Sequence, residues 1–395
     1  MKKDFPIFQH KKPLIYLDNA ATTHKPQVVI DAICNFYSHH YGTVHRALYS
    51  LSTEATLLYN QSRQSVQNFI NAKQAEEIIF TKGTTDSINL VAKSFAKSFL
   101  KPGDEILISE IEHHSNIVPW QMVCEQYGTH LKWIPVDDQG DLCLESLDHL
   151  VTHKTKLLSI AHVSNTLGTI HPIQTLIQAA HAKGAKVLID GAQAAAHQSI
   201  DVQALDADFY AFSGHKLYGP TGIGILYGKT TLLEGMEPIT GGGDMIEKVD
   251  LTKSSYAKPP LKFEAGTPPI AQAIGLQAAI HYLSKVGIHQ IQSHEARLLL
   301  YATEQLQTIP GMRLIGTSDH KAGIISFTIK GKHPLDMVTL LDFEGICVRS
   351  GHHCSQPTMK RFKIDSTLRL SLGLYNTLED IDMCIAALKR IITKI

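Results

Sequence analysis

The sequence predicts an α/β protein with a mostly parallel sheet and a smaller α/β unit toward its C-terminus. Short apolar segments alternate with longer amphipathic ones from about residue 60 to residue 230. Segments that are apolar on both faces and separated by helices are typical of parallel strands covered by helices on both sides. We therefore expect a seven-stranded, mostly parallel sheet from the segments at 77–80, 105–109, 131–136, 156–162, 186–190, 208–212 and 222–227.

Amphipathic segments between these strands predict the covering helices. They span residues 85–100, 117–127 and 173–183, and Gly184 follows the last of them, as at a helix C-cap. Residues 241–260 are glycine-rich, then polar, and end in two prolines, which predicts a long excursion from the sheet. Loops of this length are usually functional or mobile.

The chain is longer than one hydrophobic core usually supports, so we expect two domains. The later segments are strand-like at 323–329 and 345–349 and helical at 378–392. We place a large domain at 12–282, which includes the glycine-rich excursion. Residues 1–11 and 283–395 are expected to form a small domain.

The charge balance excludes diffuse binding to polyanions. The chain has 37 Lys and Arg residues and 37 Asp and Glu residues. It therefore has no excess of positive charge that would bind nucleic acid or an anionic membrane. No apolar run reaches the ~20 residues of a membrane span, and the N-terminus has no apolar signal segment. The six cysteines form no CxxC pair, which is typical of a reducing compartment. We expect a soluble, cytoplasmic protein.

Gly83, Thr84 and Thr85 lie between an expected strand and an expected helix. Small residues at such a turn let backbone N–H groups and hydroxyls converge on an anion, which the helix dipole also favours. The turn therefore predicts a phosphate site. An ordinary helix N-cap is the alternative.

Asp190 ends an expected strand and is followed by Gly191 and, two residues later, by Gln193. Ligands of open α/β sheets bind outside the carboxyl ends of the strands. A carboxylate at that position suits a cationic ring nitrogen. The alternative is an Asx turn or N-cap in which Gly191 relieves strain.

Lys216 follows the expected strand 208–212 within the glycine-framed sequence SGHKLYGPTG. Partial desolvation lowers the pKa of an amine toward the range that Schiff-base chemistry needs. Ser213 and His215 beside it are suited to an anion site. A solvated surface lysine is the alternative, which the dense glycine context weakens.

Cys354 lies in the sequence RSGHHC, on a glycine-containing loop beside two histidines and Arg349. This electropositive setting favours the thiolate. A buried, inert cysteine fits Cys347 better, because that residue lies inside an apolar strand. A metal site is the other alternative, but adjacent His352 and His353 lack the spacing of helical ligands, and we expect no metal.

The first three features are a phosphate turn, an acid for a ring nitrogen and a Schiff-base lysine. Pyridoxal phosphate (PLP) requires these three groups as a set. The thiol then indicates a reaction at sulfur.

The sequence resembles the cysteine desulfurases of aminotransferase class V, PLP fold type I, nearly from end to end. The SGHK, GTT and DGAQ motifs are specific for this superfamily, and RSGHHC with GGGDMI resembles its SufS-like, group II branch, which includes selenocysteine lyases. The motifs that carry the resemblance are YLDNAATTHKP (16–26), VHRALYSLS (44–52), GTTDSIN (83–89), EHHSNIVPWQ (112–121), HVSNTLGT (162–169), DGAQAAAH (190–197), FSGHKLYGPTGIGILY (212–227), GGGDMI (241–246), FEAGTP (263–268) and RSGHHC (349–354).

The resemblance implies a role for each cofactor residue. Lys216 carries PLP as a Schiff base, Asp190 holds the pyridinium N–H, and Gln193 bonds the phenolic oxygen. His113 stacks on the ring and suits proton transfer, given an ordinary pKa near ~6.5. The implied phosphate ligands are Thr85, Ser213 and His215, with Thr267 reaching across from the partner subunit of a homodimer.

The resemblance also implies the substrate site and the reaction. Arg369 clamps the carboxylate of L-cysteine, with Asn165 and Arg349 beside it. Cys354 takes the sulfur as a persulfide, which leaves L-alanine. His45 and Arg46 belong to the rim of the site.

The implied acceptor of the persulfide is a SufE- or SufU-like protein that serves iron–sulfur scaffold proteins. Selenocysteine lyase activity is expected as well. A catalytically silent scaffold protein is one alternative, but its signature would be loss of the lysine, aspartate or thiol, and Lys216, Asp190 and Cys354 are all present. An aminotransferase or a kynureninase-like enzyme is another alternative on the same fold, but neither requires RSGHHC.

Overall fold

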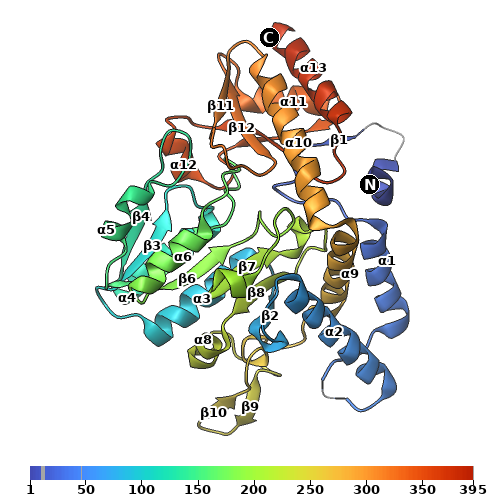
Figure 1. Cartoon of the computed structure of the whole chain (residues 1–395). Helices are drawn as coiled ribbons and strands as arrows, with labels where there is room; N and C mark the ends of the chain where they lie inside the picture. Colours follow the sequence, from blue (N-terminus) through green and yellow to red (C-terminus); the bar gives the residue numbers. More distant parts are fainter. Residues whose placement is uncertain (10–13, 46, 395) are drawn as a thin grey trace.

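The structure is a computed structural model that describes residues 1–9, 14–45 and 47–394 (Figure 1). Its largest sheet has seven strands in the order β2-β8-β7-β6-β5-β3-β4. The strands are β2 (Ile78–Thr81), β3 (Glu105–Ser109), β4 (His130–Ile134), β5 (Thr155–Ala161), β6 (Lys186–Asp190), β7 (Phe209–Ser213) and β8 (Gly224–Gly228). The predicted seven-stranded, mostly parallel sheet is confirmed.

Among the strands of this sheet, β8 alone runs against the others. Only residues 214–223 connect it to β7. A parallel connection needs a crossover of a dozen or more residues, usually with a helix, so this connection returns the chain antiparallel.

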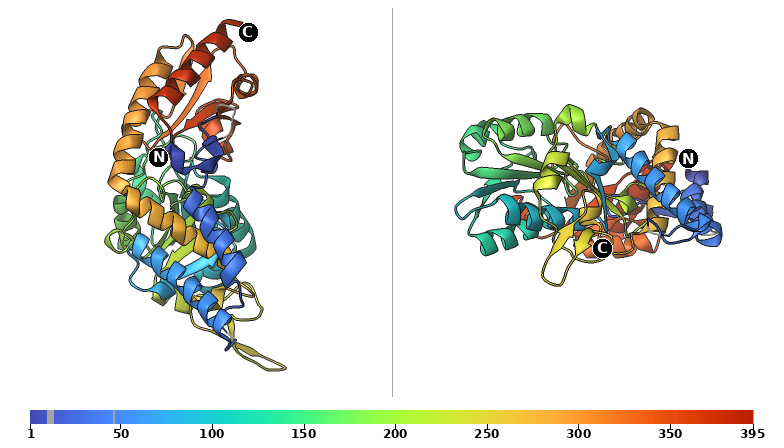
Figure 2. Two further views of the ribbon diagram at one scale, coloured as in Figure 1. Left: turned by 90° about the vertical axis from the view of Figure 1, so that its right-hand side faces the viewer. Right: turned by 90° about the horizontal axis from the view of Figure 1, so that it is seen from below.

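Helices cover both faces of the large sheet (Figure 2). Side chains along β5 alternate between two cores. Leu157 shares a core with α3 and α4, whereas Leu158 shares one with α2, α6 and α9. This alternation explains why the strands have apolar side chains on both faces. The helices are α1 (Gln27–Asn35), α2 (Ser50–Phe69), α3 (Thr84–Phe99), α4 (Val118–Tyr127), α6 (Ile173–Ala182) and α9 (Ile270–Val286), with the short α5 (Leu147–Leu150), α7 (Val202–Leu205) and α8 (Thr230–Gly235).

The second sheet has the order β11-β12-β15-β14 and is antiparallel. Leu17 packs into its core with Leu298, Phe327 and Leu388. The elements are β11 (Met312–Ile315), β12 (Ile324–Ile329), β14 (Arg349–Gly351) and β15 (Thr367–Ser371), with α10 (Ile288–Gln307), α11 (Pro334–Asp342), α12 (Gln356–Arg361) and α13 (Leu378–Lys394). The smaller C-terminal α/β unit is thus present, while the domain limits at 12–282 and 283–395 stay a prediction.

The expected strand 345–349 divides in two at Val348. Its first half, β13 (Ile346–Cys347), pairs in parallel with β1 (Ile15–Tyr16), and its second half joins the small sheet as β14. A segment from near the N-terminus therefore lies beside the small sheet.

The glycine-rich excursion contains an antiparallel hairpin of β9 (Ile246–Val249) and β10 (Ser254–Tyr256). It projects from the end of the molecule farthest from the small sheet (Figure 1). Val249, Leu251 and Tyr256 are exposed there. The excursion therefore has secondary structure of its own, which the glycine content did not predict.

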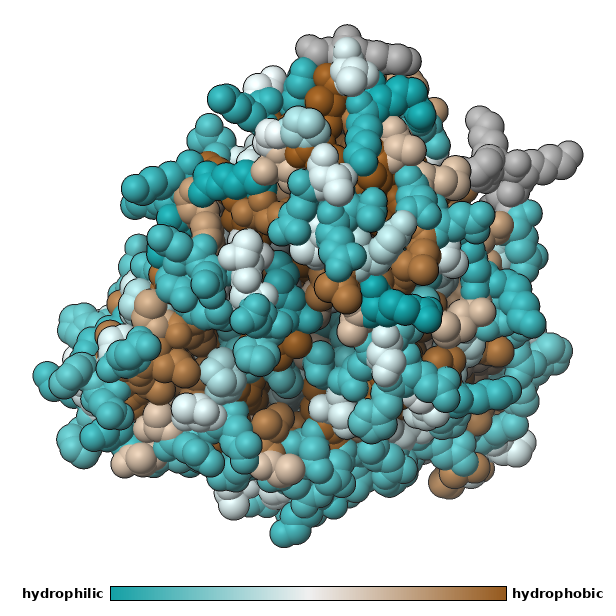
Figure 3. All heavy atoms as spheres, turned by 45° about the horizontal axis from the view of Figure 1, so that its top comes forward, coloured by the Kyte–Doolittle hydropathy of each residue, from teal (hydrophilic) through white to brown (hydrophobic). Residues whose placement is uncertain are grey.

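Hydrophilic side chains cover most of the face shown in Figure 3, with hydrophobic residues in smaller areas between them.

All six cysteines are free thiols. Cys384 is the fully buried one, whereas Cys347, expected to be buried, is half-buried. Among the residues that the structure describes, no helix is long and apolar enough to cross a membrane.

A substitution at Gly224 would test the close packing of β8 against the turn before α3. A Cβ atom at Gly224 would lie 2.4 Å from the Cα of Gly83, so the backbone would have to shift. We expect Gly224→Ala to lower the free energy of unfolding by about 1–3 kcal/mol, measured by urea unfolding. Gly241→Ala is the control, since its Cβ meets nothing within 4 Å. Equal stability of the two variants would contradict the packing described here.

Candidate active site

A cavity of about 300 Å³ lies where both sheets meet, at the carboxyl ends of β5, β6 and β7. The large sheet supplies Ala161, Asp190 and Ser213 at these strand ends, as expected for an open α/β sheet. The small sheet contributes residues of β14 and β15. The predicted site residues that line the cavity are Thr85, His113, Asn165, Asp190, Gln193, Ser213, His215, Lys216, Arg349, Cys354 and Arg369.

The turn into α3 forms a cradle of donors on one side of the cavity. Ser213 accepts a hydrogen bond from the backbone N–H of Thr84 at 2.8 Å, and the two hydroxyls lie 2.7 Å apart. Thr85 lines the cavity in the first turn of α3, a sixteen-residue helix. Backbone N–H groups and the helix dipole favour an anion at this point.

His215 lies beside this cradle as a neutral imidazole. Burial and the neighbouring charge of Lys216 lower its pKa to about 4. Its Nδ1 lies 3.2 Å from the hydroxyl of Thr22, a residue of the N-terminal segment. The predicted anion site therefore consists of neutral donors and a helix N-terminus.

In the wall of the cavity, Asp190 is buried and Lys216 is half-buried. Lys216 ends a short 3₁₀ turn, Gly214–Lys216, directly after β7. Burial lowers the pKa of its amine to about 8, against the opposing attraction of the Asp190 carboxylate. Burial raises the pKa of Asp190, while the N–H of Ala192 at 2.9 Å and the charge of Lys216 lower it. The lysine is therefore desolvated, as its glycine context predicted.

Gln193 reaches from the same strand end toward the N-terminal segment. Its side-chain amide donates to the carbonyl of Ala20 at 2.8 Å. This contact orients the amide at the cavity wall and ties residues 19–23 to the large sheet.

His113 lies on the loop after β3 and has an unusually low pKa. Its Nδ1 accepts from the backbone N–H of Ser115 at 3.0 Å and lies 2.8 Å from the Ser115 hydroxyl. Burial, and then the charge of Lys216, lower its pKa to about 3. The imidazole therefore stays neutral even in mildly acidic solution, where an ordinary histidine with a pKa near ~6.5 would be protonated.

Glu112 anchors this loop, although the sequence did not single it out as a site residue. Its carboxylate accepts from Ser109 at 2.5 Å, from Asn116 at 2.7 Å and from the N–H of Ala161 at 2.9 Å. Burial raises its pKa to about 7. The only signal in the sequence was its place in the EHHSN motif.

Cys354 is exposed and lies on the loop between β14 and α12. His353 and Cys354 both have positive φ angles, 50° and 55°, which side chains other than glycine adopt rarely. Such strain persists only where the surrounding structure holds it.

Hydrogen bonds to segments that follow β3 and β5 of the large sheet hold this strained loop. His114 donates its backbone N–H to the Cys354 carbonyl at 2.7 Å and accepts the N–H of Gln356 at 3.1 Å. Asn165 donates to the carbonyl of His353 at 2.7 Å. The thiol is thereby held at the cavity rim.

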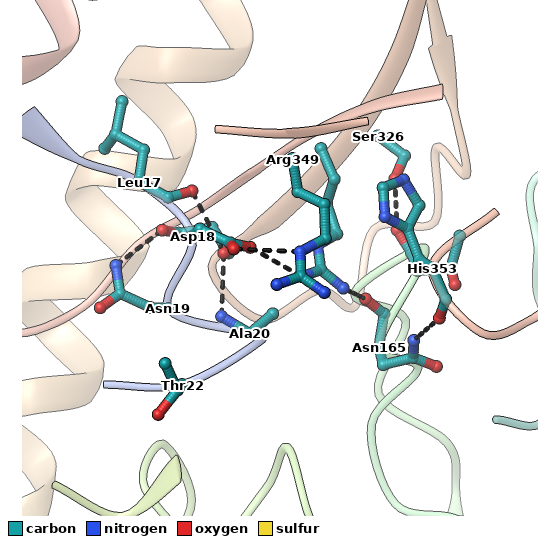
Figure 4. Close-up of polar contacts among 12 residues, drawn as sticks. Leu17, Asp18, Asn19, Ala20, Thr22, Asn165, Ser326, Arg349 and His353 are labelled. Carbon is teal, nitrogen blue, oxygen red and sulfur yellow. Dashed lines mark hydrogen bonds and ion pairs between the residues drawn. The ribbon is translucent and has the colours of Figure 1, made fainter. Parts of the chain in front are cut away.

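Two arginines of the small sheet share one carboxylate (Figure 4). Arg369 donates to Asp18 at 2.9 Å and to the carbonyl of Asn165 at 2.9 Å. Arg349 donates to the other oxygen of Asp18 at 3.0 Å. Asp18 was not among the predicted site residues, although it lies in the YLDNAATTHKP motif.

Three expected residues lie apart from this cavity or cannot be placed. Thr267 is exposed and does not line the cavity of its own chain. His45 is exposed and has a φ of 73°. Arg46 lies outside the described residues.

The cavity fits pyridoxal phosphate by the chemistry of its donors. A desolvated amine, a buried carboxylate, a neutral imidazole and a hydroxyl-lined helix N-terminus converge in one space. These groups match the Schiff base, the ring nitrogen, the ring face and the phosphate in turn.

Known proteins resemble this chain along nearly all of its length. The family model of aminotransferase class V matches residues 15–384. The cysteine desulfurase of Dickeya dadantii is 49% identical over 395 residues, which cover 99% of this chain and 96% of that protein. The cysteine desulfurase of Synechococcus elongatus is 48% identical over 100% of this chain, which spans only 63% of that relative's length. The probable cysteine desulfurases of Mycolicibacterium paratuberculosis and Mycobacterium leprae are likewise matched over only 58% and 64% of their lengths.

Solved structures show the same similarity in three dimensions. The cysteine desulfurase CsdA of Escherichia coli, in an S-sulfonic acid form, has a TM-score of 0.94 at 41% identity. The apo cysteine desulfurase of Thermococcus onnurineus NA1 has a TM-score of 0.96 at 39% identity. Each alignment covers 100% of this chain and 98% of the other. The chain therefore belongs to the aminotransferase class-V family and is a homologue of the cysteine desulfurases.

Proposed function

We propose that this protein is a PLP-dependent cysteine desulfurase that converts L-cysteine to L-alanine and keeps the sulfur as a persulfide on Cys354. The observation that supports this most strongly is the shared cavity. The exposed thiol of Cys354 lines the same space as the half-buried Lys216 and the buried Asp190. An aminotransferase would need the lysine and the aspartate but not the thiol.

The cofactor contacts that we propose follow the predicted roles. Lys216 holds PLP as a Schiff base, Asp190 faces the ring nitrogen, and Gln193 and His113 contact the ring. The proposed phosphate ligands are Thr85, Ser213 and His215, with Thr267 of the partner subunit in a homodimer. When bound, PLP supplies an electron sink for negative charge at the substrate's Cα.

The lowered pKa of Lys216 suits this amine for proton transfer. With a pKa of about 8, a useful fraction of free Nζ is neutral near pH 7–8 and can remove the Cα proton. His113, whose pKa is lowered to about 3, stays neutral near pH 7 and is too weak a base to carry a proton. Lys216 is therefore the proton carrier that we propose at Cα.

Cys354 performs the sulfur transfer. Its thiolate Sγ attacks the substrate sulfur, so that a new S–S bond forms while the substrate Cβ–S bond breaks. The substrate carbon takes a proton and leaves as L-alanine, and the enzyme keeps one sulfur as Cys354–S–SH. Arg369, with Asn165 and Arg349, holds the substrate carboxylate during this step.

The exposure of Cys354 supports transfer of the persulfide to another protein. We propose a SufE- or SufU-like acceptor that delivers sulfur to iron–sulfur scaffold proteins. The SufS-like motifs also support selenocysteine lyase activity. Six free thiols support the cytoplasm as the compartment.

The proposed function is tested with the purified protein loaded with PLP. The loaded protein should absorb visible light and form L-alanine from L-cysteine, with sulfide released when a reductant is added. A protein that stays colourless with added PLP and forms no alanine would disprove the proposal.

Replacing Cys354 with Ala separates the thiol from the cofactor chemistry. We expect loss of persulfide and sulfide formation from L-cysteine, with a smaller loss of selenocysteine turnover, because the weaker C–Se bond needs the thiol less. Alanine formation from both substrates is the measurement. Cys34→Ala is the matched control, since Cys34 is also exposed but does not line the cavity. An equal loss with both substrates would contradict the selenium expectation.

The pKa of Lys216 predicts the pH dependence of its reaction with an aldehyde. Only the neutral amine attacks a carbonyl, so a lowered pKa makes the residue reactive at lower pH. In the cofactor-free protein, imine formation trapped by borohydride should rise through a midpoint near pH 8. The labelled peptide is identified by mass spectrometry, and Lys216→Arg is the control. A midpoint near that of exposed lysines, about 10.4, would show that the amine is solvated.

A further inference from the structure

Asp18 contacts two arginines that lie side by side on adjacent strands of the small sheet. Arg349 and Arg369 are direct partners in the pairing of β14 with β15, so their side chains leave the same face of the sheet. Like charges directly opposite each other repel. The carboxylate of Asp18 offers one oxygen to each guanidinium, at 2.9 Å and 3.0 Å, and so compensates this repulsion (Figure 4).

The backbone around Asp18 is fixed to the same sheet. The carbonyl of Leu17 accepts the N–H of Ser371 at 2.7 Å, and the Ser371 hydroxyl accepts the N–H of Ala20 at 2.9 Å. On the other side, the N–H of Leu17 donates to the carbonyl of Cys347 at 2.8 Å. The carboxylate is therefore held in place before any ligand binds.

Arg369 depends on Asp18 for its orientation. Its side chain is only 3% exposed, and its Nε has no hydrogen-bond partner among the residues that the structure describes. Its terminal nitrogens donate to Asp18 and to the carbonyl of Asn165. Each terminal nitrogen carries a second hydrogen, so the guanidinium keeps donors for a bidentate carboxylate.

We propose that Asp18 is a positioning residue for the carboxylate of the amino-acid substrate. It holds Arg369, and with it Arg349, in the orientation that receives this carboxylate. Arg349 is 47% exposed and has more freedom, so the buried contact to Arg369 carries most of the effect. The inference rests on the proposed function, in which Arg369 binds the carboxylate of L-cysteine.

The first test is steady-state kinetics of the PLP-loaded Asp18→Asn variant. An amide offers an oxygen to one guanidinium and directs its N–H groups at the other, so the arginine pair loses its common acceptor. We expect KM for L-cysteine to rise on the order of tenfold, with kcat changed by less than about threefold. Asp18→Glu should restore part of the loss in KM.

A matched control separates this role from the loss of any arginine–aspartate pair. Asp138 accepts from Arg361 at 2.9 Å at the surface, away from the cavity. Asp138→Asn should leave KM and kcat unchanged. An unchanged KM in Asp18→Asn, or a fall in kcat alone, would overturn the proposal.

The second test measures recognition of the carboxylate in the absence of catalysis. Calorimetry on the PLP-loaded protein compares the binding of L-alanine with that of L-alaninamide, which lacks the carboxylate charge. Asp18→Asn should weaken L-alanine about tenfold and leave L-alaninamide within about twofold. Because the comparison is a ratio within one protein, partial unfolding does not affect it.

The two proposals fail in different ways. A wild-type protein that binds L-alanine over L-alaninamide but makes no alanine from L-cysteine would disprove the proposed function alone. Equal weakening of both ligands in Asp18→Asn would disprove the role of Asp18, whatever the reaction.

Discussion

The active site depends on the hydrogen bonds that join loops of the two sheets. The large sheet carries the lysine and the aspartate, whereas the small sheet carries the thiol and the arginines. His114 accepts from and donates to the loop of Cys354, and Asn165 donates to the carbonyl of His353. These contacts hold the loop of the thiol at the rim of the cavity that Lys216 also lines. A strained backbone at Cys354 is tolerated because both sides of the loop are anchored.

Burial then gives each titratable group of the cavity its chemical character. The pKa of Lys216 falls to about 8 and that of His113 to about 3, while the pKa of Asp190 rises. Desolvation is the largest cause in all three groups, because it penalises whichever form is charged. An exposed cleft with the same residues would therefore lack a reactive amine near neutral pH.

Much of the fold followed from local patterns in the sequence. The segments 105–109 and 186–190 coincide with β3 and β6, since their apolar runs have clear polar limits. The reversed direction of β8 was not predicted, because periodicity carries no information on strand direction. The β9–β10 hairpin was missed because its exposed strands have no buried face to produce a pattern.

The sequence could predict the site residues that directly follow strands. It could not predict contacts between residues that are far apart in the chain. Asp190, Ser213 and Lys216 could be placed together because the carboxyl ends of neighbouring parallel strands meet. Asp18 could not, because its partners Arg349 and Arg369 lie 331 and 351 residues away in the chain. The low pKa of His113 was equally hidden, since it arises from burial that no local motif encodes.

The neutral charge of the whole chain conceals a separation of charge inside the cavity. The small sheet supplies two arginines and the N-terminal segment supplies Asp18, so this end stays cationic and favours a carboxylate. The cradle at α3 uses hydroxyls, backbone N–H groups and the neutral His215 instead. Dipoles would therefore stabilise a phosphate at this cradle, whereas positive charge would stabilise a carboxylate at the arginines. In the proposed function, the charge of the arginines directs the carboxylate of the amino acid toward Arg369, and the cradle is left free for the cofactor.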